Sequence, residues 1–256
     1  MWGETALGLL FALFLLTIWQ KRSLTLFGTM SAGVLGTLIY VWTSWPGTAA
    51  LLIFFISSTA LSRLKRQEKA QRDSWQVWAN GGPMLLFAAL YSAVPWEGFL
   101  AAAVGAVAAS NADTWASEIG RRFGGRPFHI RSRKQTENGW SGAVSTVGTL
   151  GACGGAALIG GAVFYLSEEL GMFMLVSVCI AGAGGCFIDT FLGAYAERIN
   201  WCSECKSYTE AEVHHGRKTI YASGVSWMTN NAVNALSSFG GGMIVTALYA
   251  ALLFSF

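Results

Sequence analysis

Charge and long polar stretches are both scarce in this chain. Only 12% of its 256 residues are Asp, Glu, Lys or Arg, whereas 53% are hydrophobic and the mean hydropathy is +0.45. The longest polar stretch is about twenty residues, which is too short to form a domain of its own. These shortages exclude a separate soluble domain, and we expect one integral membrane domain over residues 1–256.

Apolar runs of helix length recur along the whole chain. Each is near the roughly 20 residues that a helix needs to cross about 30 Å of hydrocarbon. We therefore expect an all-α fold, a polytopic transmembrane helical bundle of about seven to eight spans. The expected spans are 2–20, 26–43, 47–62, 79–95, 98–120, 141–166, 171–197 and 224–254, the last bent or broken at Gly240, Gly241 and Gly242.

Basic residues are missing from every second loop. All 17 Lys and Arg lie at 21–22, 63–72, 121–134 and 198–218, whereas the other loops and the N-terminal tip carry only Glu. By the positive-inside rule, the basic segments are cytoplasmic and the N-terminus is outside. This predicts a multi-pass protein of the inner (cell) membrane, with cytoplasmic loops near 63–78, 121–140 and 198–223. The distribution of basic residues along the chain is more informative than the net charge of +3, and no nucleic-acid partner is expected.

A basic leader and a small-residue cleavage site are also missing before Lys21. We expect the first span to remain as an anchor. Of the five cysteines, three fall in expected spans and two, Cys202 and Cys205, in a cytoplasmic loop, so no disulfide is expected.

Two aspartates stand in apolar surroundings. Asp113 and Asp189 each end an apolar stretch, and each is followed by a glutamate, Glu118 or Glu197. An ionised carboxylate in hydrocarbon costs about 2.5–3.5 kcal/mol on insertion scales, so such groups usually face a bundle interior. The pair predicts a polar site for a cationic species. The alternative is two separate carboxylates satisfied by nearby hydroxyls or arginines.

Polar residues recur at helical spacing in five expected spans. The groups are Gln76 and Asn80; Ser110, Asp113, Thr114 and Ser117; Ser141, Ser145, Thr149 and Cys153; Gly182, Gly185, Asp189 and Gly193; and Asn230, Asn234 and Ser237, with Asn231 at the border. For the glycines, close helix packing is an equal explanation. For a single Asn, an interhelical hydrogen bond explains the residue, but the whole set indicates a hydrophilic cavity.

Two basic or metal-binding motifs lie in the expected cytoplasmic loops. Arg131, Arg133 and Lys134 stand close together beside the in-membrane carboxylates, which suits a phosphorylated ligand with a divalent metal. The alternative for such a loop is topology and attraction to lipid headgroups. Cys202-x-x-Cys205, with His214 and His215 after it, could bind a structural Zn²⁺, although free thiols remain the alternative.

Six segments carry a family resemblance. They are SSTALSRLKR (57–66), QVWANGG (76–82), SNADTWASEIGRRFG (110–124), SGAVSTVGT (141–149), GCFIDTFLGA (185–194) and NNAVN (230–234). Together they resemble the integral-membrane family that includes the plant chloroplast phytyl-phosphate kinase of vitamin E synthesis. Asp-x-x-x-x-Glu-x-Gly before a basic loop is also distantly similar to CTP-dependent dolichol kinases and phosphatidate cytidylyltransferases.

Two positions depart from that resemblance. Asn230-Asn231 stands where we expect Asn-Asp, so one possible carboxylate is missing. The HHG at 214–216 replaces a His-x-Cys-Gly arrangement, which weakens the zinc hypothesis.

The resemblance implies a membrane isoprenoid-phosphate kinase. It would transfer the terminal phosphate of a nucleoside triphosphate, CTP in the first place, to a prenyl or phytyl monophosphate at the cytoplasmic face, with Mg²⁺. We expect Asp113 and Asp189 to bind the metal, Glu118 to be a third carboxylate and Lys134 to act with the aspartates in catalysis. The expected substrate- and nucleotide-binding residues are Asn80, Asn111, Ser117, Glu118, Arg131, Arg133, Ser141, Ser145, Asn230, Asn231 and Asn234.

Three rival functions stay open. A cytidylyltransferase would use the same groups and release pyrophosphate. A prenol kinase would need Asp113 or Glu118 as a base. An ion-coupled transporter would need a polar path to the outer side, where the fifth to seventh spans are Ala, Val, Gly and Leu. The sequence also leaves open the isoprenoid, the nucleotide and a homodimer.

Overall fold

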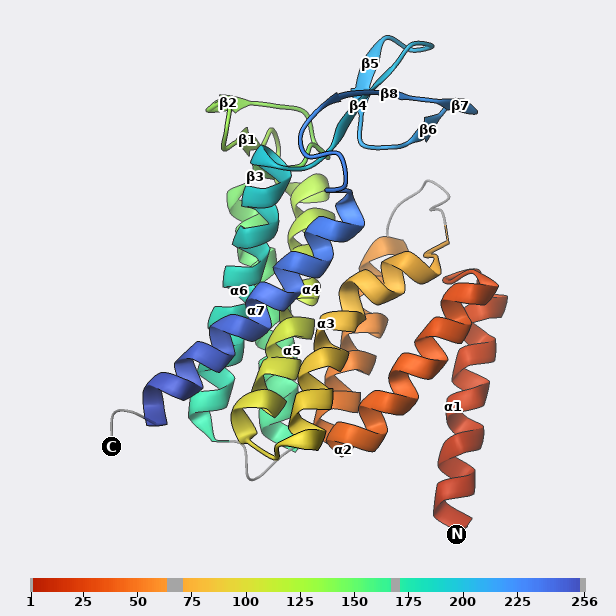
Figure 1. Cartoon of the computed structure of the whole chain (residues 1–256), viewed down its shortest axis with the longest axis vertical. Coiled ribbons are helices and arrows are strands. Elements are labelled where there is room, and N and C mark those ends of the chain that lie inside the picture. Colours follow the sequence, from red (N-terminus) through yellow and green to blue (C-terminus); the bar gives the residue numbers. More distant parts are fainter. Residues whose placement is uncertain (1, 64–70, 167–170, 254–256) are drawn as a thin grey trace.

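The protein is mostly helical. The computed structural model describes residues 2–63, 71–166 and 171–253. Within these ranges the helices form one bundle (Figure 1): α1 (Trp2–Gln20), α2 (Leu26–Arg63), α3 (Ser74–Ala93), α4 (Glu97–Phe123), α5 (Thr146–Leu166), α6 (Met172–Tyr195) and α7 (Asn230–Leu253).

Four of the described helices are long and apolar enough to cross a membrane, namely α2, α5, α6 and α7. The part of α1 from Gly8 to Gln20 is apolar but shorter, and α3 and α4 fall outside this group. Several membrane-spanning helices are therefore confirmed. The count of seven to eight spans, and with it the outside position of the N-terminus, is not supported by helix length and composition.

Helix α2 consists of two halves that run in opposite directions. Ser44 has φ 53° and ψ −142°, and Pro46 follows it, where the ring removes a backbone donor and disfavours the helical conformation just before it. A straight helix of 38 residues would be about 57 Å long. Yet Leu24, just before α2, pairs with Arg72, which follows the other end of this helix. The nine residue steps from Arg63 to Arg72 span about 30 Å at most, so a straight α2 could not bring Leu24 and Arg72 together. The halves correspond to the expected spans 26–43 and 47–62.

Helix α4 is the centre of the bundle. It contacts α2, α3, α5, α6 and α7, and every residue from Leu100 to Ala112 is buried. Most of these residues are Ala, Gly or Val, so the neighbouring backbones can approach closely.

Small residues lock α4 against α6 and α7. A Cβ built on Gly185 of α6 would overlap the methyl group of Ala109, and one built on Gly241 of α7 would lie 2.7 Å from that same methyl. The methyl of Ala109 thus occupies a notch between the two glycines. Helix α7 is continuous from Asn230 to Leu253, so the expected break at its glycines is wrong. The glycines serve close packing instead.

The all-α prediction is wrong for the segments between the helices. Short antiparallel strands gather at one end of the bundle (Figure 1), opposite the N-terminus. The first sheet contains β1 (Phe128–His129), β2 (Lys134–Gln135) and β3 (Ala143–Val144), in the order β2-β1-β3. Strands of two to four residues produce no apolar run of helix length, so this sequence pattern does not reveal them.

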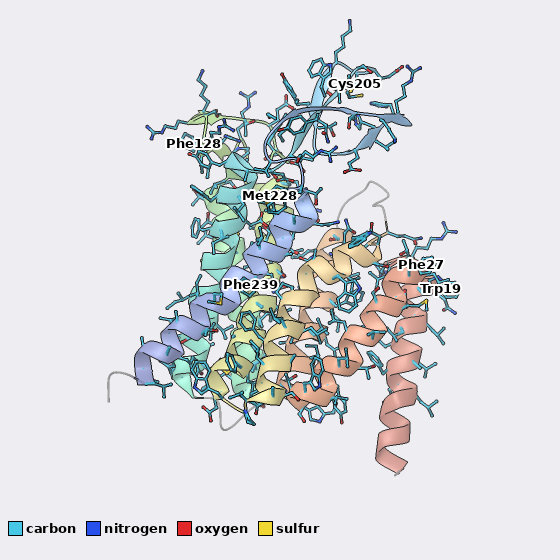
Figure 2. All side chains as sticks on the ribbon, viewed as in Figure 1. Trp19, Phe27, Phe128, Cys205, Met228 and Phe239 are labelled. Atoms are coloured by element: carbon cyan, nitrogen blue, oxygen red, sulfur yellow. The ribbon has the colours of Figure 1, made fainter. Side chains whose placement is uncertain are left out.

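The second group of strands forms an extension, residues 199–223, inserted between α6 and α7. It contains β4 (Ile199–Cys202), β5 (Ser207–Thr209) and β8 (Ile220–Ser223) in the order β5-β4-β8, and a hairpin of β6 (Val213–His214) and β7 (Arg217–Lys218). Figure 2 places Cys205 in this extension, away from the helices.

Figure 2 also places Trp19 and Phe27 together, where α1 ends and α2 begins. These aromatic side chains are exposed, as is typical of residues at a membrane–water interface.

We predict that Gly185→Ala lowers thermal stability because the new methyl group would force α4 and α6 apart. Overpacking of this kind costs about 1–3 kcal/mol. Gly161→Ala in α5 is the matched control, since no atom lies within 4 Å of its added Cβ and Ala favours a helix. The melting temperature of the detergent-solubilised protein measures both. Equal losses in the two variants would contradict the close approach of α4 and α6.

Candidate functional site

A cavity of about 490 Å³ extends between the helices towards the strand-bearing end of the bundle. All seven helices contribute to its lining, together with Arg72, a loop at 138–145 and Glu210 of the strand extension. Asp113 and Asp189 both line it. The structure therefore brings these two residues to one cavity.

One wall of the cavity is apolar. Helices α1 and α2 provide phenylalanine, leucine and isoleucine side chains: Phe11, Phe14, Leu15, Ile18, Leu35, Leu51, Leu52, Phe54 and Phe55. Phe14 and Phe55 meet edge to face, with ring centroids 5.8 Å apart. The cavity can thus accommodate a hydrocarbon chain beside its polar groups.

Helix packing brings the two aspartates together. Asp113 lies one turn beyond Ala109 on α4, and Asp189 lies one turn beyond Gly185 on α6. Because Ala109 and Gly185 are in contact and the helices run in the same direction, both carboxylates project at one level. The two carboxylates repel each other, and the hydroxyl of Ser237 on α7 donates to Asp189 Oδ2 at 3.1 Å.

The residues present fit a divalent cation. Mg²⁺ is usually held by one or two carboxylates plus water and substrate phosphates, and Asp113 and Asp189 supply two carboxylates. Four ionisable acids line the cavity (Asp113, Glu118, Asp189 and Glu210) against two arginines (Arg72 and Arg121), so its formal charge is −2 when all are ionised. A cation would offset this charge.

Glu118 is placed differently from the sequence expectation. It lines the cavity, but its Oε1 accepts from Ser62 Oγ at 3.3 Å and pairs with Arg121 at 3.3 Å. Among the described residues it does not form a three-ligand cluster with the aspartates. Its contacts hold the Arg121 guanidinium at the cavity, and they explain Glu118 better than a third metal ligand does.

The loop 138–145 lies on the last turn of α6. Gly142 has φ 78°, and a Cβ there would overlap Ala194, so the backbone needs glycine at this point. The neighbouring Ser141 donates a short hydrogen bond to Glu197 Oε2. Burial raises the pKa of Glu197 to about 7, and repulsion from Glu210 adds to this rise, while hydrogen bonds from Ser141 and Asn230 oppose it. Burial also raises the pKa of Glu210.

Most of the predicted polar residues do line the cavity. They are Asn80, Asp113, Ser117, Glu118, Ser141, Ser145, Asp189, Asn230 and Asn234. Ser141 and Ser145 reach it from the loop before α5, because that helix begins at Thr146 and not at residue 141. The helical spacing from which they were predicted is therefore not what brings them to the cavity.

Five predicted site residues do not line the cavity. Lys134 is exposed on β2, and Arg133 lies in the β1–β2 turn with φ 54°. Arg131 stacks over the ring of Tyr195, at 5.9 Å from the ring centroid. The basic cluster thus points elsewhere, and its roles in catalysis and phosphate binding find no support in the geometry.

The other two are asparagines. Asn231 is half-buried away from the cavity lining. Asn111 is fully buried; it accepts from Ser57 Oγ at 2.9 Å and donates to the Gly155 carbonyl at 2.7 Å. These interhelical hydrogen bonds join α2, α4 and α5, and they match the alternative explanation for a single Asn.

The sequence reasoning missed three charged lining residues: Arg72, Arg121 and Glu210. Burial lowers the pKa of the Arg72 guanidinium, and the charge of Glu118 opposes this. Gln76 is oriented by a capping box, in which its side chain accepts from the Asp73 backbone while Asp73 Oδ1 accepts from the Gln76 backbone. The sequence signal for Arg72 is its position directly before Asp73, the capping residue of α3.

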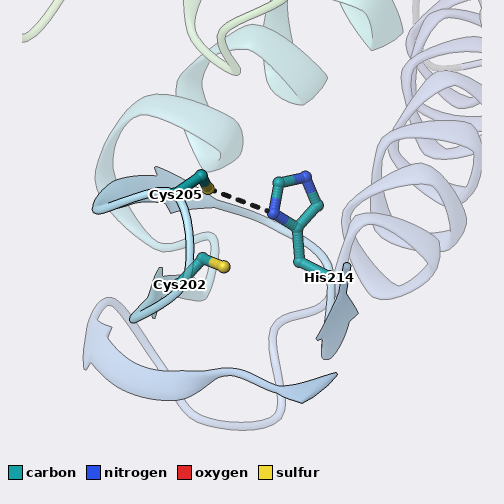
Figure 3. A group of neighbouring side chains, drawn as sticks. All are labelled: Cys202, Cys205 and His214. Carbon is teal, nitrogen blue, oxygen red and sulfur yellow. Dashed lines mark hydrogen bonds between the residues drawn. The ribbon is translucent and has the colours of Figure 1, made fainter. Parts of the chain in front are cut away.

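A second polar cluster lies in the strand extension. The ligand atoms of Cys202, Cys205 and His214 all lie within 4.8 Å of one another (Figure 3). The Cys205 Sγ is 3.5 Å from His214 Nδ1. His215, the fourth residue of the predicted zinc motif, is exposed and is not part of the cluster.

Comparisons with known proteins agree with a membrane protein. The model of the family described as integral membrane protein DUF92 matches residues 9–242. An uncharacterised membrane protein of Synechocystis is 27% identical over 256 residues, covering 94% of this chain and 88% of its own. An uncharacterised membrane protein of Methanocaldococcus jannaschii is 28% identical, with 72% and 79% covered. Protein PGR of Arabidopsis thaliana is 26% identical, with 86% of each chain covered. No solved structure matches.

We predict that Glu197→Gln stabilises the protein above about pH 7 and has little effect below pH 4.5. The pKa of Glu197 in the fold, about 7, lies above its ordinary value of 4.5. The folded state therefore holds the proton more tightly, and the wild type loses stability as the pH rises from 4.5 to about 7. The full shift corresponds to about 3 kcal/mol.

Melting temperatures of wild type and variant across this pH range provide the measurement. Glu137→Gln is the control, because it makes the same change at an exposed position. A difference for Glu197→Gln that stays constant from pH 4 to 8 would contradict the burial of an ionisable carboxyl at this position.

Proposed function

This chain belongs to the DUF92 family of integral membrane proteins, and we propose that it is an isoprenoid-phosphate kinase. It transfers the terminal phosphate of a nucleoside triphosphate, with CTP as the first candidate, to a prenyl or phytyl monophosphate. The observation that carries this proposal is one cavity in which two aspartates from different helices share a space with an apolar wall.

A prenyl phosphate, like this cavity, has an apolar part and a charged part. Its hydrocarbon tail would lie along the phenylalanine and leucine side chains of α1 and α2, where apolar surface is removed from contact with polar groups. Its phosphate would lie beside Asp113 and Asp189, at the level where α3, α4 and α5 contribute hydroxyl and amide groups. A soluble nucleotide reaches the same space from the strand-bearing end.

Bound at Asp113 and Asp189, Mg²⁺ would neutralise the phosphate oxygens that the transfer brings together. The Ser237 hydroxyl holds the Asp189 carboxylate in place by its hydrogen bond. The Arg72 and Arg121 guanidinium groups are the cations that line the cavity, and we assign phosphate binding to them in place of the basic cluster at 131–134.

The reaction needs little acid–base chemistry from the protein. An oxygen of the prenyl phosphate forms a bond to the γ-phosphorus as the bond from that phosphorus to the β-phosphate oxygen breaks. The products are prenyl diphosphate and nucleoside diphosphate. Because the attacking oxygen is already anionic, the side chains have to align the two phosphates and offset their charge.

We also propose the finer membrane arrangement that the charge pattern predicts. Each half of α2 and each of the other six helices would cross the inner (cell) membrane once, with the N-terminus outside. Two features support this proposal: the 17 basic residues are confined to alternate segments, and the two ends of α2 lie beside each other.

The function is tested with purified protein in lipid nanodiscs, a panel of prenyl monophosphates and prenols, Mg²⁺ and each of the four nucleoside triphosphates. Prenyl diphosphate and nucleoside diphosphate are the expected products. Pyrophosphate with a nucleotidyl lipid would identify a cytidylyltransferase, and conversion of the free alcohol would identify a prenol kinase. No turnover, with ion flux in sealed vesicles, would identify a transporter.

We predict that Asp113→Asn and Asp189→Asn each lower kcat by about a hundredfold or more while the protein stays folded in the membrane. Asp73→Asn is the matched control, because Asn caps a helix as well as Asp does and Asp73 does not line the cavity. Wild-type activity in either cavity variant would remove the metal assignment.

We predict that Arg72→Gln and Arg121→Gln raise the KM for the nucleotide or the prenyl phosphate by roughly 10–100-fold, as expected for the loss of a charge-assisted hydrogen bond. Lys134→Ala should leave both KM values unchanged, because Lys134 is exposed and outside the cavity. Steady-state kinetics with each substrate varied measure the effect. The reverse pattern would return phosphate binding to the loop at 131–134.

A further inference from the structure

The strand extension contains a cluster that the proposed kinase reaction does not use. Cys202, Cys205 and His214 come from two different turns, yet their side chains point into one space (Figure 3). Cys202 is buried, His214 is half-buried and Cys205 is exposed. Among the described residues, this is the cluster in which three potential metal ligands lie within 4.8 Å of one another.

The distances match a tetrahedral zinc site. With a Zn–S bond of about 2.3 Å and a Zn–N bond of about 2.0–2.1 Å, tetrahedral angles place sulfur and nitrogen about 3.5 Å apart. Cys205 Sγ and His214 Nδ1 are 3.5 Å apart. Two sulfurs on one zinc would be about 3.8 Å apart, which is within the 4.8 Å limit of the cluster.

The backbone holds these ligands in position. Cys202 ends β4 and pairs with Ser207 at the start of β5, and Cys205 lies within the tight turn between them, which Lys206 completes with φ 52°. His214 ends β6, and the next two residues, His215 and Gly216, have φ 53° and 73°, as in a two-residue hairpin turn.

The two turns are also joined outside the cluster. Arg217 of β7 pairs with Glu204, which lies between the two cysteines, at 3.3 Å.

We propose that Cys202, Cys205 and His214 bind one Zn²⁺ ion, with a solvent molecule as the fourth ligand. The ion joins the β4–β5 turn to the β6–β7 hairpin. It thereby closes a loop of the chain that contains Glu210, the extension's contribution to the cavity lining. The ion holds the two turns of the extension together and takes no part in phosphate transfer.

Metal content tests the proposal without reference to activity. Full-length protein is purified under reducing conditions and analysed for zinc, then stripped with a chelator and titrated with Co²⁺. We expect one zinc per chain, a thiolate-to-cobalt charge-transfer band on titration, and a lower melting temperature after chelation. Absence of zinc together with absence of the cobalt band would overturn the proposal.

Four variants identify the ligands. Cys202→Ser and His214→Ala should lose the zinc, whereas Cys179→Ser in α6 and the adjacent His215→Ala should retain it. Should a variant fail to fold, the cobalt titration of wild type still decides the question. Retention of zinc in His214→Ala with loss in His215→Ala would overturn the ligand assignment. A Cys202–Cys205 disulfide, found by mass spectrometry after thiol alkylation, would also overturn it.

These outcomes are separate from those of the kinase proposal. Zinc content can be normal in a protein that transfers no phosphate, and phosphate transfer can occur in a protein that binds no zinc.

Discussion

The contact of one methyl group with two glycines determines the geometry of the site. Ala109 of α4 lies against Gly185 of α6 and Gly241 of α7, so three helices meet with almost no side chain between them. One turn from this point, towards the strand-bearing end, each helix carries a polar residue: Asp113, Asp189 and Ser237. The apolar packing therefore sets the distances among the polar groups. Close-packed interiors adjust little, which makes such a contact a rigid reference point for a charged site.

The cavity requires a counter-charge as well as a rigid frame. Its lining has two more acidic than basic side chains, and the helices around it are apolar. An uncompensated charge of this kind is costly in a low-dielectric environment. In the proposed function, a bound cation would relieve that cost, and the phosphate groups would compensate the cation in turn. The pairing of a metal with an anionic lipid headgroup follows from this balance more directly than the transport of a free ion, which would leave the acids unpaired after each release.

The two aspartates inside apolar runs could be predicted from the sequence, whereas the charged residues of the connecting segments could not. Asp113 and Asp189 stand out because the surrounding composition makes any carboxylate expensive, and the helical period then gives their orientation. Lys134 follows Asp113 in the basic loop after α4, but it is exposed on β2 and lies outside the cavity lining. Glu210 reaches the cavity only because a strand extension folds over it, and strands of two to four residues leave no periodic signal.

Helix α1 packs mainly on α2, with Phe11 against Gly36 and Leu15 against Gly33. It nevertheless forms part of the apolar wall of the cavity. A small outward movement of α1 would open the apolar wall laterally to the bilayer and would break one helix–helix contact. A long hydrocarbon chain could then enter and leave laterally, without its tail ever passing through water.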